Sequence, residues 1–465
     1  MIRIIGGGLA GSEAAWQAAR HGVPVSIHEM RPVRTTPVHR TDRLAELVCS
    51  NSFRGDKLDN AVGLLKAEMR QLDSLVMRVA DATRVPAGGA LAVDRDRFAN
   101  GITEALAAEP LVAIHREEVA RLPATTDPRA PVIIATGPLT SARLSSDINA
   151  LVGREQLYFF DAISPIVHAD SIDHSRVFRA SRRTKTRGAP AASCPPPVGD
   201  DAAGGDYVNC PMDEVEYARF YDALTHAELA EAHDLDRTPF FEGCLPIEVM
   251  AHRGVDTLRF GPMKPVGLTD PVTGRRPYAV VQLRQDDLAA DHFSLVGFQT
   301  QLKWGEQRRV LRLIPGLANA EFVRFGMIHR NTYINAPTVL RATWQTRERP
   351  ALFFAGQLSG VEGYVESAAS GLMAGLNAVA LARGEAPAEL PRTTALGALA
   401  YYVSHANRAN YQPTNVTFGL MPALPRPPRG RAARRQAIAS RALADLEAWR
   451  AARWGADAPT PAIVS

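Results

Sequence analysis

The first eleven residues constrain this chain most. Residues 2–5 form a short apolar run, and Gly6, Gly8 and Gly11 follow with the spacing G-x-G-x-x-G before a helix-forming stretch. Glycine at the first two positions allows a tight turn and close approach of a pyrophosphate, while Gly11 lets the helix pack against the strand. The helix amino end then faces the phosphates. We predict a dinucleotide site formed by Gly6, Gly7, Gly8, Leu9, Ala10 and Gly11.

A second strand is predicted at residues 23–29, directly after that helix. It ends on Glu29, about twenty residues past the glycines, where a carboxylate usually holds the adenosine ribose. A bare glycine motif is often only a turn, but strand, glycines, helix, strand and acid in this order are typical of a nucleotide site. We interpret Glu29 as the ribose ligand.

Two later segments return to the same pattern. Residues 132–136 form an apolar run that ends at Gly137, and residues 351–355 form another that leads into a glycine-rich loop and a helix. A flavin and its ribityl phosphate need close backbone approach and a helix terminus. Two such junctions at opposite ends of one chain favour FAD over NAD as the resident cofactor. The predicted contacts are Gly137, Gly356, Gly363, Tyr364, Val365 and Ser367.

The predicted fold class is α/β, with a Rossmann-like FAD-binding domain of the glutathione-reductase type. We expect this domain to be discontinuous, over residues 1–145 and 326–465, because residues 146–325 lack glycine fingerprints and suit an inserted α/β substrate or RNA domain. The 465 residues are 46% hydrophobic, which suffices for two or three domains. No segment has the pattern of a signal peptide or the length of a membrane span, so we expect a cytoplasmic protein.

The positive charge lies mainly at the carboxyl end. The net charge is +4, and residues 426–465 contain eight arginines against three acids. We predict a terminal helix over residues 443–454 with a cationic lead-in, and a second basic run lies at residues 179–187. Such runs attract polyanions, although most are only solvated faces. Residues 188–205 are rich in Pro, Ala and Gly and are expected to form an exposed loop.

Four cysteines are too few and too scattered for a disulfide framework or a zinc ribbon. We therefore expect free thiols and no metal site. They are Cys49, Cys194, Cys210 and Cys244.

Several longer motifs then follow one another along the chain. Together they closely resemble the folate- and FAD-dependent tRNA (uracil-5-)-methyltransferases, the TrmFO family, from residue 1 to about residue 425. The glycine motifs alone would also match the related GidA family of tRNA-modifying flavoproteins. The motifs are Cys49–Arg54, Pro86–Asp94, Tyr207–Met212, Phe241–Glu248, Arg259–Gly267, Met327–Tyr333 and Asn410–Gly419.

The resemblance implies methylation of uridine 54 in the T-loop of tRNA. The carbon would come from 5,10-methylenetetrahydrofolate and the electrons from NADPH or NADH, with FAD as the cofactor. The implied partners are tRNA and folate, with no membrane, and we expect a monomer. Open alternatives are the same carbon transfer onto ribosomal RNA, a GidA-like modification of a wobble uridine, a small-molecule flavin oxidoreductase, and a flavoprotein that only binds RNA.

Uracil C5 is a poor nucleophile until a group adds at C6, and a thiolate is well suited to add there and leave later. By resemblance, Cys244 in the Glu-Gly-Cys-x-Pro-Ile-Glu motif is this nucleophile, and Glu242 and Glu248 serve orientation or proton transfer. Cys49 matches the second functional cysteine, which removes the C5 proton or protects the flavin adduct. The roles of the two cysteines are open to exchange.

The target uridine should be extruded from its folded loop into a pocket. His329 is the predicted ring that stacks on the pterin of the folate, against the alternative of a packed surface histidine. Arg284, Lys303 and Lys264 are candidates for the folate glutamate or an RNA phosphate. Tyr411 and Phe418 flank a loop and are candidates for stacking on RNA, against the alternative that loop aromatics only anchor their loop.

Overall fold

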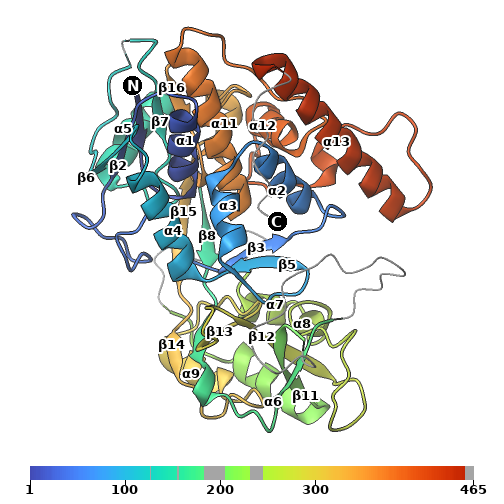
Figure 1. Ribbon diagram of the computed structural model, residues 1–465. Coiled ribbons are helices and arrows are strands. Elements are labelled where there is room, and N and C mark those ends of the chain that lie inside the picture. Colours follow the sequence, from blue (N-terminus) through green and yellow to red (C-terminus); the bar gives the residue numbers. More distant parts are fainter. Residues whose placement is uncertain (126, 154–156, 183–204, 231–244, 456–465) are drawn as a thin grey trace.

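The computed structural model describes residues 1–125, 127–153, 157–182, 205–230 and 245–455 (Figure 1). Its upper lobe contains a five-stranded parallel sheet in the order β16-β7-β1-β2-β6. Because every strand runs in one direction, the loops that follow them meet at one edge of the sheet. This sheet confirms the predicted α/β class. The strands are β1 (Ile2–Ile5), β2 (Val25–Glu29), β6 (Val112–Arg116), β7 (Val132–Ile134) and β16 (Leu352–Phe354).

Two helices, one from each end of the chain, pack against each other in this lobe. They are α1 (Leu9–Arg20) and α11 (Tyr364–Ala382). Glycine is needed where they cross, because a Cβ at Gly371 would lie 2.1 Å from the Ala10 carbonyl oxygen. Among the described helices, α11 is the one with the length and hydropathy of a membrane span, and 89% of that window is buried inside the protein.

The lower lobe contains a six-stranded antiparallel sheet in the order β10-β11-β12-β13-β9-β14. Its strands are β9 (Ile166–His168), β10 (Phe178–Ala180), β11 (Tyr207–Met212), β12 (Ala279–Gln285), β13 (His292–Leu295) and β14 (Phe322–Arg324). This lobe also carries the helices α6 (Glu214–Thr225), α7 (Ile247–His252), α8 (Thr257–Phe260) and α9 (Trp304–Leu311). An antiparallel pair, β8 (Leu157–Ala162) and β15 (Ile328–Tyr333), lies between the lobes. The exact domain limits stay a prediction.

The remaining elements complete the upper lobe. The sheet β3-β5-β4 faces the lower lobe in Figure 1, and it consists of β3 (Ser52–Gly55), β4 (Arg84–Val85) and β5 (Ala90–Val93). The helices are α2 (Ala61–Gln71), α3 (Leu75–Ala82), α4 (Arg95–Ala107), α5 (Ala142–Val152), α10 (Ala336–Val339), α12 (Ala395–His405) and α13 (Arg431–Trp454).

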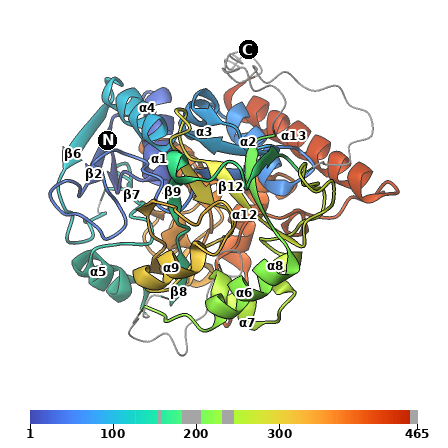
Figure 2. The ribbon, with the colours of Figure 1, turned by 90° about the horizontal axis from the view of Figure 1, so that it is seen from below.

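The predicted start of the terminal helix is wrong. The helix α13 begins at Arg431, twelve residues before the predicted start, after Gly430 with a positive φ of 90°. Ile438 and Ala439 are already buried against the core, so packing begins well before residue 443. The arginines of the predicted lead-in from Arg431 onward therefore belong to the helix. Figures 1 and 2 both place α13 along the outside of the molecule, beside α2.

Candidate functional site

A cavity of about 410 Å³ lies at the edge of the parallel sheet where the strands end. The loops after β1, β2, β7 and β16 form one wall, together with the start of α11. The opposite wall comes from the lower lobe and includes Arg284 and residues 294–297. Both lobes therefore contribute side chains to one space.

Most of the predicted cofactor residues line this cavity. Gly7, Gly11 and Val365 are not among the lining residues, and each has an internal role. The Gly7 N–H donates to Glu29 Oε2 at 2.9 Å, Gly11 lies against the Gly6 carbonyl, and Val365 is buried in the core. The predicted residues that do line it are Gly6, Gly8, Leu9, Ala10, Glu29, Gly137, Gly356, Gly363, Tyr364 and Ser367.

One glycine shows that this space suits a bound group. Gly8 lines the cavity, its φ of −72° suits any residue, and a Cβ added there meets no protein atom within 4 Å. Neither packing nor backbone conformation therefore requires glycine at this position. At Gly137 the positive φ of 64° favours glycine, and at Gly11 packing requires it, because a Cβ would lie 1.9 Å from the Gly6 carbonyl oxygen. Gly8 is the glycine expected where backbone approaches a ligand closely.

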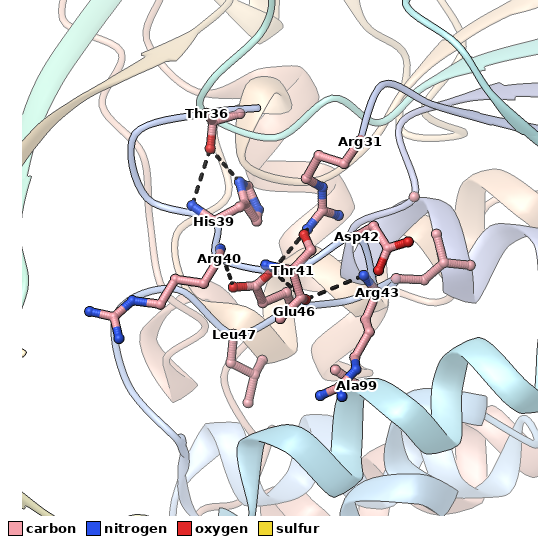
Figure 3. A network of polar contacts seen from close by, with 12 residues as sticks. Arg31, Thr36, His39, Arg40, Thr41, Asp42, Arg43, Glu46, Leu47 and Ala99 are labelled. Carbon is pink, nitrogen blue, oxygen red and sulfur yellow. Dashed lines mark hydrogen bonds and ion pairs between the residues drawn. The ribbon is translucent and has the colours of Figure 1, made fainter. Parts of the chain in front are cut away.

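Glu29 is held by its neighbours as well as by Gly7. Arg31 Nε donates to Glu29 Oε1 at 2.8 Å, and Arg31 Nη1 donates to Glu46 Oε2 at 3.0 Å. Glu46 in turn accepts the N–H groups of Arg40 and Thr41, so the loop after β2 is tied together by one carboxylate (Figure 3). Burial would raise the pKa of Glu29, but the hydrogen bonds and charge of Arg31 outweigh it and lower that pKa. Glu29 is therefore an anion, and its Oε2, which accepts one N–H within the protein, can also accept a ribose hydroxyl.

Sequence reasoning missed several residues of the wall. Arg31, His39, Glu46, Arg54 and Asn415 all line the cavity. Burial and the nearby Arg31 charge lower the pKa of His39 to about 4, so this ring is neutral at pH 7. Arg31 follows the ribose carboxylate by two residues, which is a usable signal. Arg54 lies on β3, and His39, Glu46 and Asn415 come from loops whose course the sequence pattern does not reveal.

Cys49 lies on the cavity wall, directly against Tyr364 at the start of α11. Its Sγ lies 3.0 Å from the Tyr364 hydroxyl oxygen. The same oxygen accepts the N–H groups of Cys49 at 2.8 Å and of Ser50 at 3.1 Å, which leaves the phenolic proton to point at the sulfur. Burial raises the pKa of Tyr364 well above its usual value, so the hydroxyl keeps its proton. The structure thus joins the predicted second cysteine to a predicted cofactor residue.

Of the other predicted catalytic residues, the structure describes Glu248. Cys244 and Glu242 lie outside the described residues. Glu248 is buried, and it accepts the Thr300 hydroxyl at 2.9 Å and the Gln301 N–H at 2.8 Å. Burial raises the pKa of its carboxyl. It does not line the cavity, but the segment that it holds begins next to Gln299, which does.

The remaining predicted residues fall into different surroundings. His329 lies on β15 opposite Asp161 of β8, and its side chain is outside the description. Arg284 lines the cavity, whereas Lys264 is exposed and Lys303 pairs at the surface with Glu228 at 2.8 Å. Cys210 is fully buried on β11, and burial raises the pKa of its thiol, as expected of a structural cysteine.

The prediction that Tyr411 stacks on RNA is wrong. Its side chain is 4% exposed, and its hydroxyl donates to the carbonyl oxygens of Ser359 and Gly360. The ring anchors its loop against the core instead. Phe418 is half-buried, with the Arg435 guanidinium 5.9 Å from its ring centroid.

A basic surface lies at and before the start of α13. Arg426, Arg429, Arg431 and Arg434 are exposed, and none of them forms an ion pair with a described residue. The first acidic residue after them is Asp445. We call the exposed residues Arg426, Arg429, Arg431 and Arg434 the arginine surface.

Comparisons with known proteins agree with this arrangement. The family model of glucose inhibited division protein A matches residues 1–386. The methylenetetrahydrofolate–tRNA-(uracil-5-)-methyltransferase TrmFO of Enterococcus faecalis is 55% identical over 96% of this chain and 98% of its own length. The enzyme of the same name from Desulforudis audaxviator is 57% identical over 96% of this chain and 98% of its own.

A solved structure of Aquifex aeolicus GidA has a TM-score of 0.67 at 19% identity, and the match covers 96% of this chain and 75% of that one. A second crystal form of the same protein gives a TM-score of 0.65 at 18% identity, with coverage of 96% and 73%. At this identity the likeness concerns the fold.

Proposed function

Because the chain belongs to the GidA family, and within it to the TrmFO methyltransferases, we propose that it methylates C5 of a tRNA uridine with carbon from methylenetetrahydrofolate. The observation that carries this function is the placement of Cys49 on the wall of the cavity that the glycine loops also line. A thiol beside a dinucleotide site suits chemistry in which a sulfur and a redox cofactor act on the same base.

The residues of the cavity fit FAD. Glu29 would hold the adenosine ribose, residues 6–10 and the start of α1 the pyrophosphate, and residues 363–367 the flavin end. The open space beside Gly8 supports this fit. When bound, FAD supplies the reducing electrons, which NADPH or NADH delivers to it. The protein supplies positions and charges around it.

In this proposal Cys244 adds to uracil C6 and Cys49 accepts the proton that leaves C5. The Tyr364 hydroxyl accepts the N–H groups of Cys49 and Ser50 and lies against the Cys49 sulfur, so the thiol keeps one orientation toward the cavity. Glu242 stays a candidate for proton transfer. Glu248 acts by holding the Thr300–Gln301 segment beside the lining residue Gln299.

His329 is proposed to stack on the pterin of the folate. Its strand β15 supports the cavity wall, because the Thr332 N–H and hydroxyl both bond to the carbonyl oxygen of the lining residue Pro138. An alanine variant of His329 is expected to raise KM for methylenetetrahydrofolate while FAD stays bound, and steady-state kinetics with flavin absorbance measure both.

The arginine surface is proposed to bind the RNA backbone. Its four side chains are exposed and lack carboxylate partners among the described residues, and α13, which carries Arg431 and Arg434, runs along the outside of the molecule (Figure 2). A T-loop uridine extruded into the cavity would leave the rest of the tRNA outside, where phosphates need positive partners. We further propose a cytoplasmic monomer, which size-exclusion chromatography with light scattering tests.

The decisive experiment measures transfer of labelled carbon. Purified FAD-loaded protein, NADPH and labelled methylenetetrahydrofolate are incubated with a T-loop transcript and with the same transcript lacking the target uridine. Label is expected in the first transcript alone and should be lost in the Cys244→Ala and Cys49→Ala variants. Absence of label with the unmodified protein would refute the function.

The competing functions are the same carbon transfer onto ribosomal RNA and a GidA-like modification of a wobble uridine. Mass spectrometry of tRNA and rRNA from cells with and without the protein separates them. Loss of 5-methyluridine from the T-loop alone supports our proposal, whereas loss from rRNA, or of a wobble modification, supports a competitor.

A further inference from the structure

The five-residue loop that carries Cys49 is held on both sides by arginines. Arg95 Nη1 donates to the Leu47 carbonyl oxygen at 2.9 Å, before the cysteine. After it, Arg284 donates from Nη2 to Ser50 Oγ and from Nε to Asn51 Oδ1, both at 2.9 Å. Arg95 comes from α4 in the upper lobe and Arg284 from β12 in the lower lobe. The position of the sulfur is therefore set by both lobes.

The charges of the two arginines are balanced differently. Arg95 forms an ion pair with Asp286 through both carboxylate oxygens, at 2.8 and 3.2 Å. Arg284 is 9% exposed and donates to the neutral Ser50 and Asn51, and among the described carboxylates it forms no ion pair within contact distance. Asp286, the partner of Arg95, acts on the Arg284 charge only from a distance. A buried guanidinium cannot shed its proton, so it is stabilised by an anion nearby.

Among the described residues, the charged groups that interact with Cys49 through space are arginines. From α11, Tyr364 is a neutral hydrogen-bond donor, and Arg54 beside it is neutralised by Glu366. From β14, Arg324 interacts electrostatically with Cys49 as well as with Arg95, and burial and the neighbouring arginines lower its pKa to about 10. Arg284 also interacts with the sulfur.

The charges of Arg95, Arg284 and Arg324 thus face one described carboxylate, Asp286, which pairs with Arg95 and also acts on Arg284. A sulfur anion would offset part of this excess. Positive groups of this kind stabilise reactive thiolates.

We propose that Arg284 is a positioning residue for Cys49, which fixes the Cys49 loop from the lower lobe and supplies the positive charge that keeps the sulfur a thiolate. The role in catalysis rests on the proposed function. A thiolate accepts the proton that leaves uracil C5 and becomes a thiol, while the electron pair of the broken C–H bond stays with the ring. Arg284 is thereby assigned to the cysteine rather than to a folate carboxylate or an RNA phosphate.

The test measures Cys49 itself in the FAD-loaded protein. Alkylation of the Cys49 peptide by iodoacetamide is followed by mass spectrometry at neutral pH in the parent, Arg284→Gln and Arg284→Lys. We expect the rate to fall about tenfold or more in the glutamine variant, because alkylation follows the thiolate fraction. The lysine variant keeps the charge and should retain most of the rate. Arg276→Gln, at an exposed arginine of the same lobe, is the matched control and should not change it.

Two outcomes would overturn the inference. The first is an alkylation rate in Arg284→Gln equal to that of the parent, with FAD content unchanged. The second is a raised KM for methylenetetrahydrofolate or RNA without a change in Cys49 reactivity, which would make Arg284 a ligand-binding residue. Because alkylation needs no RNA, a parent protein that methylates no transcript would refute the proposed function and leave this test intact.

Discussion

Two glycines of the first motif should respond in opposite ways to alanine. In Gly8→Ala the backbone conformation, φ −72° and ψ −170°, suits alanine, and the new methyl meets no protein atom within 4 Å. The cost in unfolding free energy should stay below about 1 kcal/mol, the price of alanine at a helix N-cap. The methyl would occupy the space that we assign to the pyrophosphate. Overpacking of about 1–3 kcal/mol corresponds to FAD binding weakened about fivefold to 150-fold.

Gly11→Ala should instead damage the fold. Its Cβ would lie 1.9 Å from the Gly6 carbonyl oxygen, whereas carbon–oxygen contacts are normally about 3.3 Å. The strand or the helix must move by more than about an ångström, which lies at the upper end of overpacking costs, about 3 kcal/mol. Gly8→Ala should thus weaken FAD binding and leave the free energy of unfolding nearly unchanged, while Gly11→Ala should lower the free energy of unfolding.

The assay separates the two effects by using protein stripped of flavin, because bound FAD would itself add stability. Urea unfolding followed by circular dichroism gives the free energy of unfolding, and quenching of flavin fluorescence gives the FAD affinity. A Gly8→Ala protein as unstable as Gly11→Ala, or one that binds FAD like the parent, would refute this interpretation of the cavity.

Three other predictions concern separate parts of the molecule. Tyr364→Phe leaves two N–H groups of the Cys49 loop without their acceptor, at about 1–3 kcal/mol for each buried donor, so methylation should fall about tenfold or more at unchanged FAD content; equal turnover would contradict this. Burial raises the pKa of Glu68 to about 8, so the free energy of unfolding should fall as the pH rises from about 4.3, the pKa in the unfolded chain, through 8. Urea unfolding of Glu68→Gln at several pH values should lack this decline. Equal pH dependence of the parent and the variant would contradict the raised pKa. Reversing Arg431 and Arg434 to Glu should weaken tRNA binding and reduce the slope of log Kd against log salt by about 1 for each arginine, as filter binding measures; an unchanged slope would remove both from the interface.

The sequence predicts those parts of the fold and site that depend on neighbouring residues. Strand, glycine turn and helix follow one another within residues 2–20, so β1, α1 and the nucleotide loop can be predicted directly. Glu29 follows from the length of one helix and one strand. The parallel sheet then brings Gly137 and Gly356 to the same edge, although they lie far apart along the chain.

Contacts that depend on tertiary placement are harder to predict. Tyr411 belongs to a polar-looking loop, but its hydroxyl finds carbonyl acceptors in the segment of Ser359 and Gly360, which makes burial favourable. The sequence pattern predicts too late a start for α13, because an arginine-rich stretch is typical of a solvated segment. Ile438 lies within that stretch and packs on the core. In both cases a partner distant in sequence decides the outcome.

The partners of Cys49 show the same limit at the point where it matters most for function. Arg95, Arg284 and Tyr364 are separated from it by 46 to 315 residues, yet each donates or accepts a bond within the loop of residues 47–51. Two of these residues belong to the upper lobe and one to the lower lobe. A shift of one lobe against the other would therefore move Arg284 away from Ser50 and Asn51 while Tyr364 stayed in place. Because the proposed thiolate depends on that arginine, the reactivity of Cys49 should report whether Arg284 of the lower lobe is in contact with Ser50 and Asn51 of the upper lobe.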